Sequence, residues 1–152
     1  MADHTFKADP GSLEIVTTYV FDVPRARVFE AYTDPALIPK WWGPEGAPLK
    51  VEKMEVTPGG SWRFIDGEGS EAITFRGIYH TVEAPKKLVA TWQYEGAPTV
   101  ILQTVTFEEQ SEGKTKVTDR MVFQSLADRE AMLTSGMGEG SVPMMERLAK
   151  LL

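Results

Sequence analysis

Residues 101–123, ILQTVTFEEQSEGKTKVTDRMVF, contain two stretches in which apolar and polar side chains alternate. Alternation with a period of two is typical of a β-strand that has one buried and one solvated face. Ser111-Glu112-Gly113 lies between the two stretches and has the composition of a turn. The segment therefore predicts an antiparallel hairpin. Its buried face is expected to carry Ile101, Val105, Phe107, Val117, Met121 and Phe123.

Similar segments lie on both sides of this hairpin. Between residues 49 and 125, about six short strands alternate with Gly- and Pro-containing turns. A β-rich run at residues 12–21 precedes them, and Asp22-Val23-Pro24 indicates the start of a helix. A short second helix is expected near residues 34–40. The order is therefore β-α-α-β6-α, an α+β fold.

The last element is expected to be a long amphipathic helix. Ser125 and Asp128 match a capping box, and apolar residues share one face near the C-terminus. Glycines between residues 136 and 140, together with Pro143, are expected to bend or interrupt this helix. An antiparallel sheet with one apolar face needs a cover, which we assign to this helix. Residues 12–152 then form a single domain, and residues 1–11 a flexible tail.

Two polar residues, Gln103 and Asp119, interrupt the apolar face of the hairpin. They lie opposite or diagonal to each other if the strands pair as expected. One interpretation is that they bond to each other, hold a buried water or lie at a rim. The other is that they anchor a ligand inside an apolar pocket. A buried carboxylate would also have a raised pKa and could act as an acid or base.

Composition excludes several classes of protein. The chain has no cysteine and only two histidines, which argues against disulfides, thiol chemistry, transition-metal sites and the usual catalytic triads. Its net charge is −6 with no basic patch, so nucleic acid is not expected as a partner. No apolar run is long enough to span a bilayer, and the N-terminus lacks a signal peptide. We therefore expect a cytoplasmic protein without metal, cofactor or membrane partner.

Several motifs, in order along residues 13–152, resemble a known family. The chain is similar to the homologues of the activator of the heat-shock protein Hsp90 ATPase, in the START-like SRPBCC superfamily. The resemblance implies a helix-grip fold, in which a curved antiparallel sheet surrounds the C-terminal helix and encloses a cavity. It rests on Phe21-Asp22-Val23-Pro24, Tyr32-Thr33-Asp34-Pro35, Trp41-Trp42-Gly43-Pro44, Pro58-Gly59-Gly60-Ser61-Trp62, Phe75-Arg76-Gly77 and Leu88-Val89-Ala90-Thr91-Trp92.

The sequence favours binding over catalysis, and it assigns no catalytic residue. The leading hypothesis is that a small apolar or amphipathic molecule binds between the sheet and the C-terminal helix. The alternatives are a chaperone-regulating interaction protein and a cyclase- or hydrolase-type enzyme that uses Asp119 as acid or base. Of the adjacent indoles Trp41 and Trp42, one is expected to pack inward and one to lie at a surface or cavity mouth. The candidate cavity residues are Trp41, Trp62, Phe64, Phe75, Trp92, Tyr94, Gln103, Asp119, Met121, Phe123, Met137 and Met145.

Overall fold

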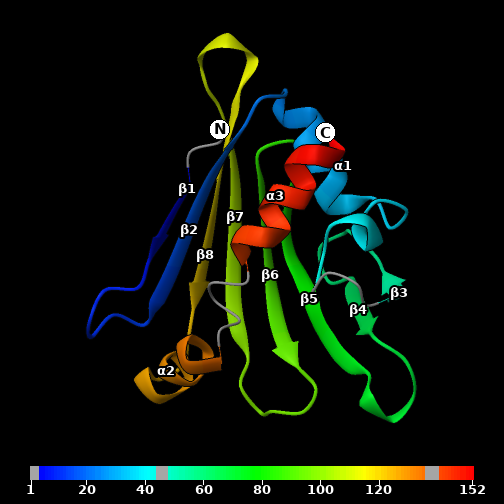
Figure 1. Ribbon diagram of the computed structural model, residues 1–152, viewed down its shortest axis with the longest axis vertical. Helices are drawn as coiled ribbons and strands as arrows, with labels where there is room; N and C mark the ends of the chain where they lie inside the picture. Colours follow the sequence, from blue (N-terminus) through cyan, green and yellow to red (C-terminus); the bar gives the residue numbers. More distant parts are fainter. Residues whose placement is uncertain (1–3, 44–47, 136–140) are drawn as a thin grey trace.

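The computed structural model describes residues 4–43, 48–135 and 141–152 (Figure 1). Within these residues, eight strands form one curved sheet in which each neighbouring pair is antiparallel. The strands are β1 (His4–Lys7), β2 (Glu14–Phe21), β3 (Leu49–Met54), β4 (Ser61–Asp66), β5 (Ile73–Glu83), β6 (Lys87–Tyr94), β7 (Ile101–Glu109) and β8 (Thr115–Val122).

The helices lie at the ends of the chain and in short connections. They are α1 (Arg25–Thr33), α2 (Leu126–Ser135) and α3 (Ser141–Leu151), with the short 3-10 turns η1 (Ile38–Lys40), η2 (Gly69–Glu71) and η3 (Ser111–Gly113). None of the helices in the described ranges is long and apolar enough to cross a membrane. The predicted α+β class and the run of six strands after the first helices are confirmed.

The sheet order is β1-β2-β8-β7-β6-β5-β4-β3, so the N-terminal strands join the last strand of the meander. The predicted hairpin at residues 101–123 is β7-β8, with η3 as its turn. Its register pairs Gln103 with Met121 and Val105 with Asp119. The two polar residues therefore lie diagonal to each other, as the alternation pattern allowed.

The N-terminal segment differs from the predicted flexible tail. His4–Lys7 forms β1 and pairs with residues 16–19 of β2. Phe6 packs against a small apolar cluster, and Arg129 of α2 donates hydrogen bonds to the carbonyl oxygens of Asp9 and Glu14 at 2.6 and 3.4 Å. These long-range contacts order a segment whose polar composition alone predicts fraying.

The C-terminal region differs from a single long helix. The structure has α2 and α3 as separate helices, and Figure 1 shows α3 in front of the sheet while α2 lies near one end of it. Residues 136–140, which include the three glycines expected to interrupt the helix, lie outside the described residues. Pro143 occupies the first turn of α3, where a backbone N–H would have no partner within the helix.

Two apolar clusters divide the interior. The larger cluster packs the sheet against α1, η1 and α3, and includes Phe107, Trp41 and Leu148. The smaller cluster is centred on Ile15, Ile101 and Phe123, with partly buried residues of α2 packed against it. Helix α2 begins as the capping box predicts, because the Ser125 Oγ accepts the backbone N–H of Asp128 at 3.1 Å. The cover of the sheet is therefore shared among several helices.

Candidate functional site

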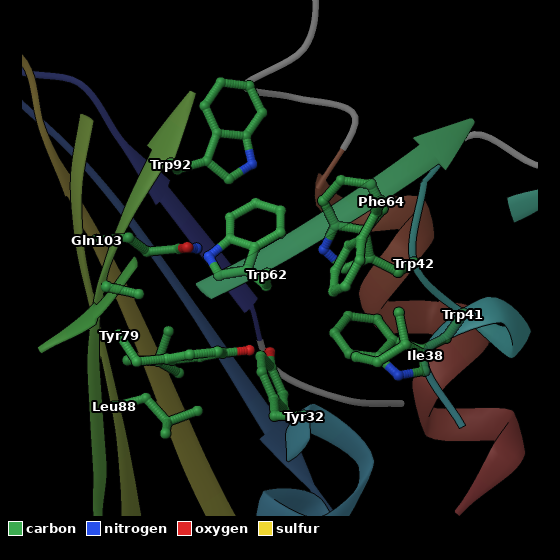
Figure 2. A pocket seen from close by; sticks show the side chains of 12 residues that line it. Tyr32, Ile38, Trp41, Trp42, Trp62, Phe64, Tyr79, Leu88, Trp92 and Gln103 are labelled. Carbon is green, nitrogen blue, oxygen red and sulfur yellow. The ribbon is translucent and has the colours of Figure 1, made fainter. Parts of the chain in front are cut away.

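A cavity of about 70 Å³ lies inside the larger cluster (Figure 2). One wall is the sheet, through β4, β5, β6 and β7, and the other is formed by α1, η1 and the two indoles that follow. All four tryptophans of the chain line it. The lining residues are Tyr32, Ile38, Trp41, Trp42, Trp62, Phe64, Tyr79, Leu88, Ala90, Trp92, Gln103 and Val105.

The helical wall differs from the expected one. The cavity was expected between the sheet and the C-terminal helix, yet none of the described α3 residues lines it. Helix α3 instead supports the wall from behind: the Tyr32 hydroxyl donates to the Met145 sulfur at 3.5 Å, and Arg147 donates to the carbonyl oxygen of Trp41 at 3.1 Å.

The adjacent indoles divide as the sequence predicted. Trp41 is 2% exposed, and its Nε1–H donates to the Ala31 carbonyl oxygen at 3.1 Å. Trp42 is half-buried, and its ring packs edge-on against Phe64 and Phe75 with centroid distances of 5.1 and 5.2 Å. Both indoles line the cavity, so the inward one also contributes to the wall.

Strand β5 leaves room for another indole. Gly77 pairs with Trp62 across β4 and β5. A Cβ atom at residue 77 would collide with the Trp62 indole and with the Thr91 carbonyl oxygen. The missing side chain therefore lets the backbone of β6 and the ring of Trp62 approach β5 closely, which places that ring in the cavity wall.

The polar end of the cavity is Gln103. Its Nε2–H donates to the Asp119 Oδ2 at 2.8 Å, which confirms the interpretation that these residues bond to each other. The other carboxylate oxygen, Asp119 Oδ1, is buried and has no hydrogen-bond partner among the described residues. Burial raises the pKa of Asp119 from 3.8 to about 6, although the hydrogen bond from Gln103 acts in the opposite direction.

Two tyrosines add hydroxyl groups. Figure 2 shows Tyr32 and Tyr79 pointing their hydroxyls into the same space from opposite walls. Burial raises the pKa of both phenols, and the Asp119 carboxylate raises that of Tyr32 further. The Tyr79 hydroxyl makes no hydrogen bond with the described residues, whereas that of Tyr32 has only the weakly accepting sulfur of Met145. Both groups are neutral near pH 7 and can donate or accept.

The structure brings only some of the candidate residues together. Trp41, Trp62, Phe64, Trp92 and Gln103 line the cavity. Others contact that wall without lining it. These are Asp119, through its bond to Gln103, Met145, through Tyr32, and Phe75, whose ring centroid lies 5.1 Å from that of Trp92.

The remaining candidates lie elsewhere. Tyr94 is 38% exposed at the end of β6, while Met121 and Phe123 belong to the smaller cluster next to α2. Met137 lies outside the described residues. The apolar face of the sheet is thus longer than the cavity, because different helices cover different parts of each strand.

The candidate set omitted seven lining residues. Alternation with a period of two puts Tyr79, Leu88, Ala90 and Val105 on the apolar faces of their strands, but it does not show which part of each face borders the cavity. Tyr32, Ile38 and Trp42 come from the helical segments. Helical spacing puts Tyr32 on the same side of α1 as Val28 and Phe29, but it gives no indication that this side faces the sheet, where the Tyr32 ring packs edge-on against Phe107 with a centroid distance of 5.2 Å.

A curved antiparallel sheet that packs around C-terminal helices and encloses a cavity defines a helix-grip protein. Residues 22–152 match the family described as Activator of Hsp90 ATPase homolog 1-like protein, and the chain belongs to this family. Proteins with this fold commonly bind ligands in the cavity.

Solved structures of bacterial proteins share the fold. Protein Ms6760 from Mycobacterium smegmatis is 24% identical, with a TM-score of 0.87 over 100% of this chain and 97% of its own. A protein from Arthrobacter aurescens is 28% identical, with a TM-score of 0.84 over 93% and 87% of the two chains. One from Staphylococcus epidermidis is 25% identical, with a TM-score of 0.83 over 97% and 93%. No curated protein matches the chain.

Proposed function

We propose that this protein binds a small apolar or amphipathic molecule in the cavity between the sheet and α1. The observation that carries the proposal is the composition of the wall. Aromatic and aliphatic side chains surround the space, while Gln103 and the Tyr32 and Tyr79 hydroxyls supply a few polar atoms. Ligand sites typically combine a mostly apolar lining with a small number of placed polar groups.

The size of the cavity limits the ligand. A dry apolar cavity of about 150 Å³ is known to admit benzene, and the volume here is about 70 Å³. The present space therefore suits a molecule of a few non-hydrogen atoms. A ligand with one ring requires displacement of a lining side chain, and Trp42 and Trp92 are the lining indoles that are only half-buried.

Two substitutions that change the cavity volume in opposite directions test whether the ligand binds there. Ala90→Val adds methyl groups to the cavity, whereas Val105→Ala removes them. In a titration with benzyl alcohol followed by tryptophan fluorescence, we expect Ala90→Val to weaken binding at least about fivefold, and Val105→Ala to strengthen it, because a missing methylene changes pocket affinity by about 10-fold or more. Circular dichroism and thermal unfolding check that each variant is folded.

The matched control is Val89→Ile, which adds bulk to the neighbouring residue of β6 on the opposite face of the sheet. Its affinity for benzyl alcohol is expected to equal that of the wild type. Equal affinities for all four proteins would mean that the molecule binds outside the cavity, and would contradict the proposal.

The family description supports a second candidate function, contact with a chaperone. The same buried substitutions distinguish it from ligand binding. If the intact chain stimulates a chaperone ATPase through its outer surface, Ala90→Val and Val105→Ala leave that stimulation unchanged as long as they fold. The acid–base alternative for Asp119 gains support only if the ligand recovered from the titration has changed chemically.

A further inference from the structure

The ligand class can be inferred from one buried carboxylate. Asp119 lies on the concave face of β8, directly behind the cavity residue Gln103. None of the residues that line the cavity is charged, and the described residues form no ion pair with Asp119. Asp119 is half-buried as a residue, and its Oδ1 is buried without a described partner. An anion in this position with a single neutral hydrogen-bond donor is costly, since the donor replaces only part of its hydration.

The hydrogen bond also determines how the Gln103 amide is presented. An ionised carboxylate can only accept hydrogen bonds, so the amide must direct its Nε2–H towards Asp119. Its Oε1 is then the acceptor left for a ligand, and Asp119 Oδ1 is a second acceptor without a partner. Burial holds the pKa of Asp119 at about 6, so the group is mainly ionised at pH 7.5. This end of the cavity therefore presents the Gln103 acceptor, with a negative charge directly behind it.

The tyrosine hydroxyls also determine which head group a ligand needs. Tyr79 has no hydrogen bond with the described residues, and it lines the same cavity as Gln103. A ligand head that both donates and accepts, such as a hydroxyl, can therefore bond to the Gln103 acceptor and to Tyr79 together. An ammonium group can donate to the Gln103 acceptor and also compensates the charge of Asp119 behind it, and aromatic walls attract cations.

We propose, building on the function above, that the cavity selects molecules carrying a hydroxyl or amino group on a small apolar body and excludes carboxylates. The donor head lies at the Gln103–Asp119 end, and the apolar body lies among the indoles. A carboxylate head would add a second anion beside Asp119 in a space of low polarity, where like charges repel strongly.

Four probes of nearly the same size test the selection at pH 7.5: benzylamine, benzyl alcohol, ethylbenzene and benzoate. Affinity is measured for the wild type and for Asp119→Asn, whose amide oxygen can still accept the bond from Gln103. We expect the substitution to weaken the binding of benzylamine at least about tenfold, because it removes the negative charge behind Gln103 that attracts an ammonium group across a space of low polarity. The affinity for benzyl alcohol should fall by a smaller factor, the affinity for ethylbenzene should change less than twofold, and the affinity for benzoate should rise.

Asp66→Asn is the matched control. Asp66 is 6% exposed, also has a buried carboxylate oxygen without a described partner, and also has a pKa raised by burial. Neither Asp66 nor Asp119 lines the cavity, but only Asp119 is joined to a lining residue, Gln103, by a described hydrogen bond. It is expected to leave the ratios among the four probes unchanged. Thermal unfolding confirms that both variants are folded.

The outcomes separate the two proposals. If every probe binds and Asp119→Asn changes all four affinities by the same factor, the selection by head group is wrong while cavity binding stands. If ethylbenzene binds but benzylamine and benzoate have equal affinities in both proteins, the selection is again wrong. If none of the four probes binds at concentrations up to their solubility, the proposed function fails together with the inference.

Discussion

Replacing Trp41 with alanine is expected to lower the free energy of unfolding by about 3–5 kcal/mol, the range for removing a large aromatic side chain from a core. Trp41 is 2% exposed, and its ring centroid lies 4.8 Å from that of Tyr32. Its indole also completes the end of α1. The Ala31 carbonyl would ordinarily accept a bond from residue 35, but Pro35 has no N–H, so Trp41 Nε1–H takes that place at 3.1 Å.

Chemical denaturation of three variants measures these contributions. Trp41→Phe keeps a ring but loses the hydrogen bond, so its cost is expected to be smaller, about 1–3 kcal/mol. Trp42→Ala is the comparison, because Trp42 is half-buried and its loss mainly enlarges the cavity. A Trp42→Ala variant less stable than Trp41→Ala would contradict the assignment of Trp41 as the buried anchor of this wall.

Replacing Asp119 with asparagine is expected to stabilise the protein above pH 7 and to change it little near pH 4. The folded state raises the pKa of Asp119 from 3.8 to about 6, so it binds this proton more tightly than the unfolded chain does. The contribution of Asp119 to the free energy of unfolding therefore falls as the pH rises from about 4 through about 6. A shift of about two pKa units corresponds to about 3 kcal/mol, which is the upper limit of the gain.

Urea denaturation at pH 4, 6 and 8 tests this prediction through the difference between the wild type and Asp119→Asn. Tyr32, the titratable group whose phenol is coupled to Asp119, stays neutral over this range because its pKa is raised. Glu108→Gln removes an exposed carboxylate from the neighbouring strand β7, and is expected to change stability by less than about 0.5 kcal/mol. If the free energies of unfolding of the wild type and Asp119→Asn differ by the same amount at all three pH values, the folded state does not raise the pKa of Asp119, and the prediction is wrong.

The elements that alternation alone determines were predicted well. The hairpin at residues 101–123 has local sequence patterns for both strands and for its turn. These patterns predict that Gln103 and Asp119 lie close together, and the structure shows a hydrogen bond between them. The capping box at Ser125 is equally local. Strand β1 was missed because its order depends on pairing with β2 and on Arg129, which is more than a hundred residues away. The composition of a short segment does not predict contacts with residues so distant in the sequence.

The site was predicted less completely for a related reason. A period of two assigns a residue to one face of a strand, but it does not say which helix covers that part of the strand. Phe123 and Trp62 are both on the apolar face, yet one packs under α2 and the other lines the cavity. Tyr94 lies on the same face but is 38% exposed, beyond the cover. Only the three-dimensional positions of α1, η1 and α2 separate these residues.

The indole N–H groups offer a direct view of the cavity. The chain has four tryptophans, all of them in the wall, so a proton–nitrogen correlation spectrum contains one indole signal for each. Single Trp→Phe variants assign the signals. During a titration with benzyl alcohol, we expect saturable shifts of the Trp42, Trp62 and Trp92 indole signals at one common affinity, and little change at exposed residues of the outer face such as His80. Unmoved indole signals, with shifts confined to the outer face or absent altogether, would contradict ligand binding in this cavity.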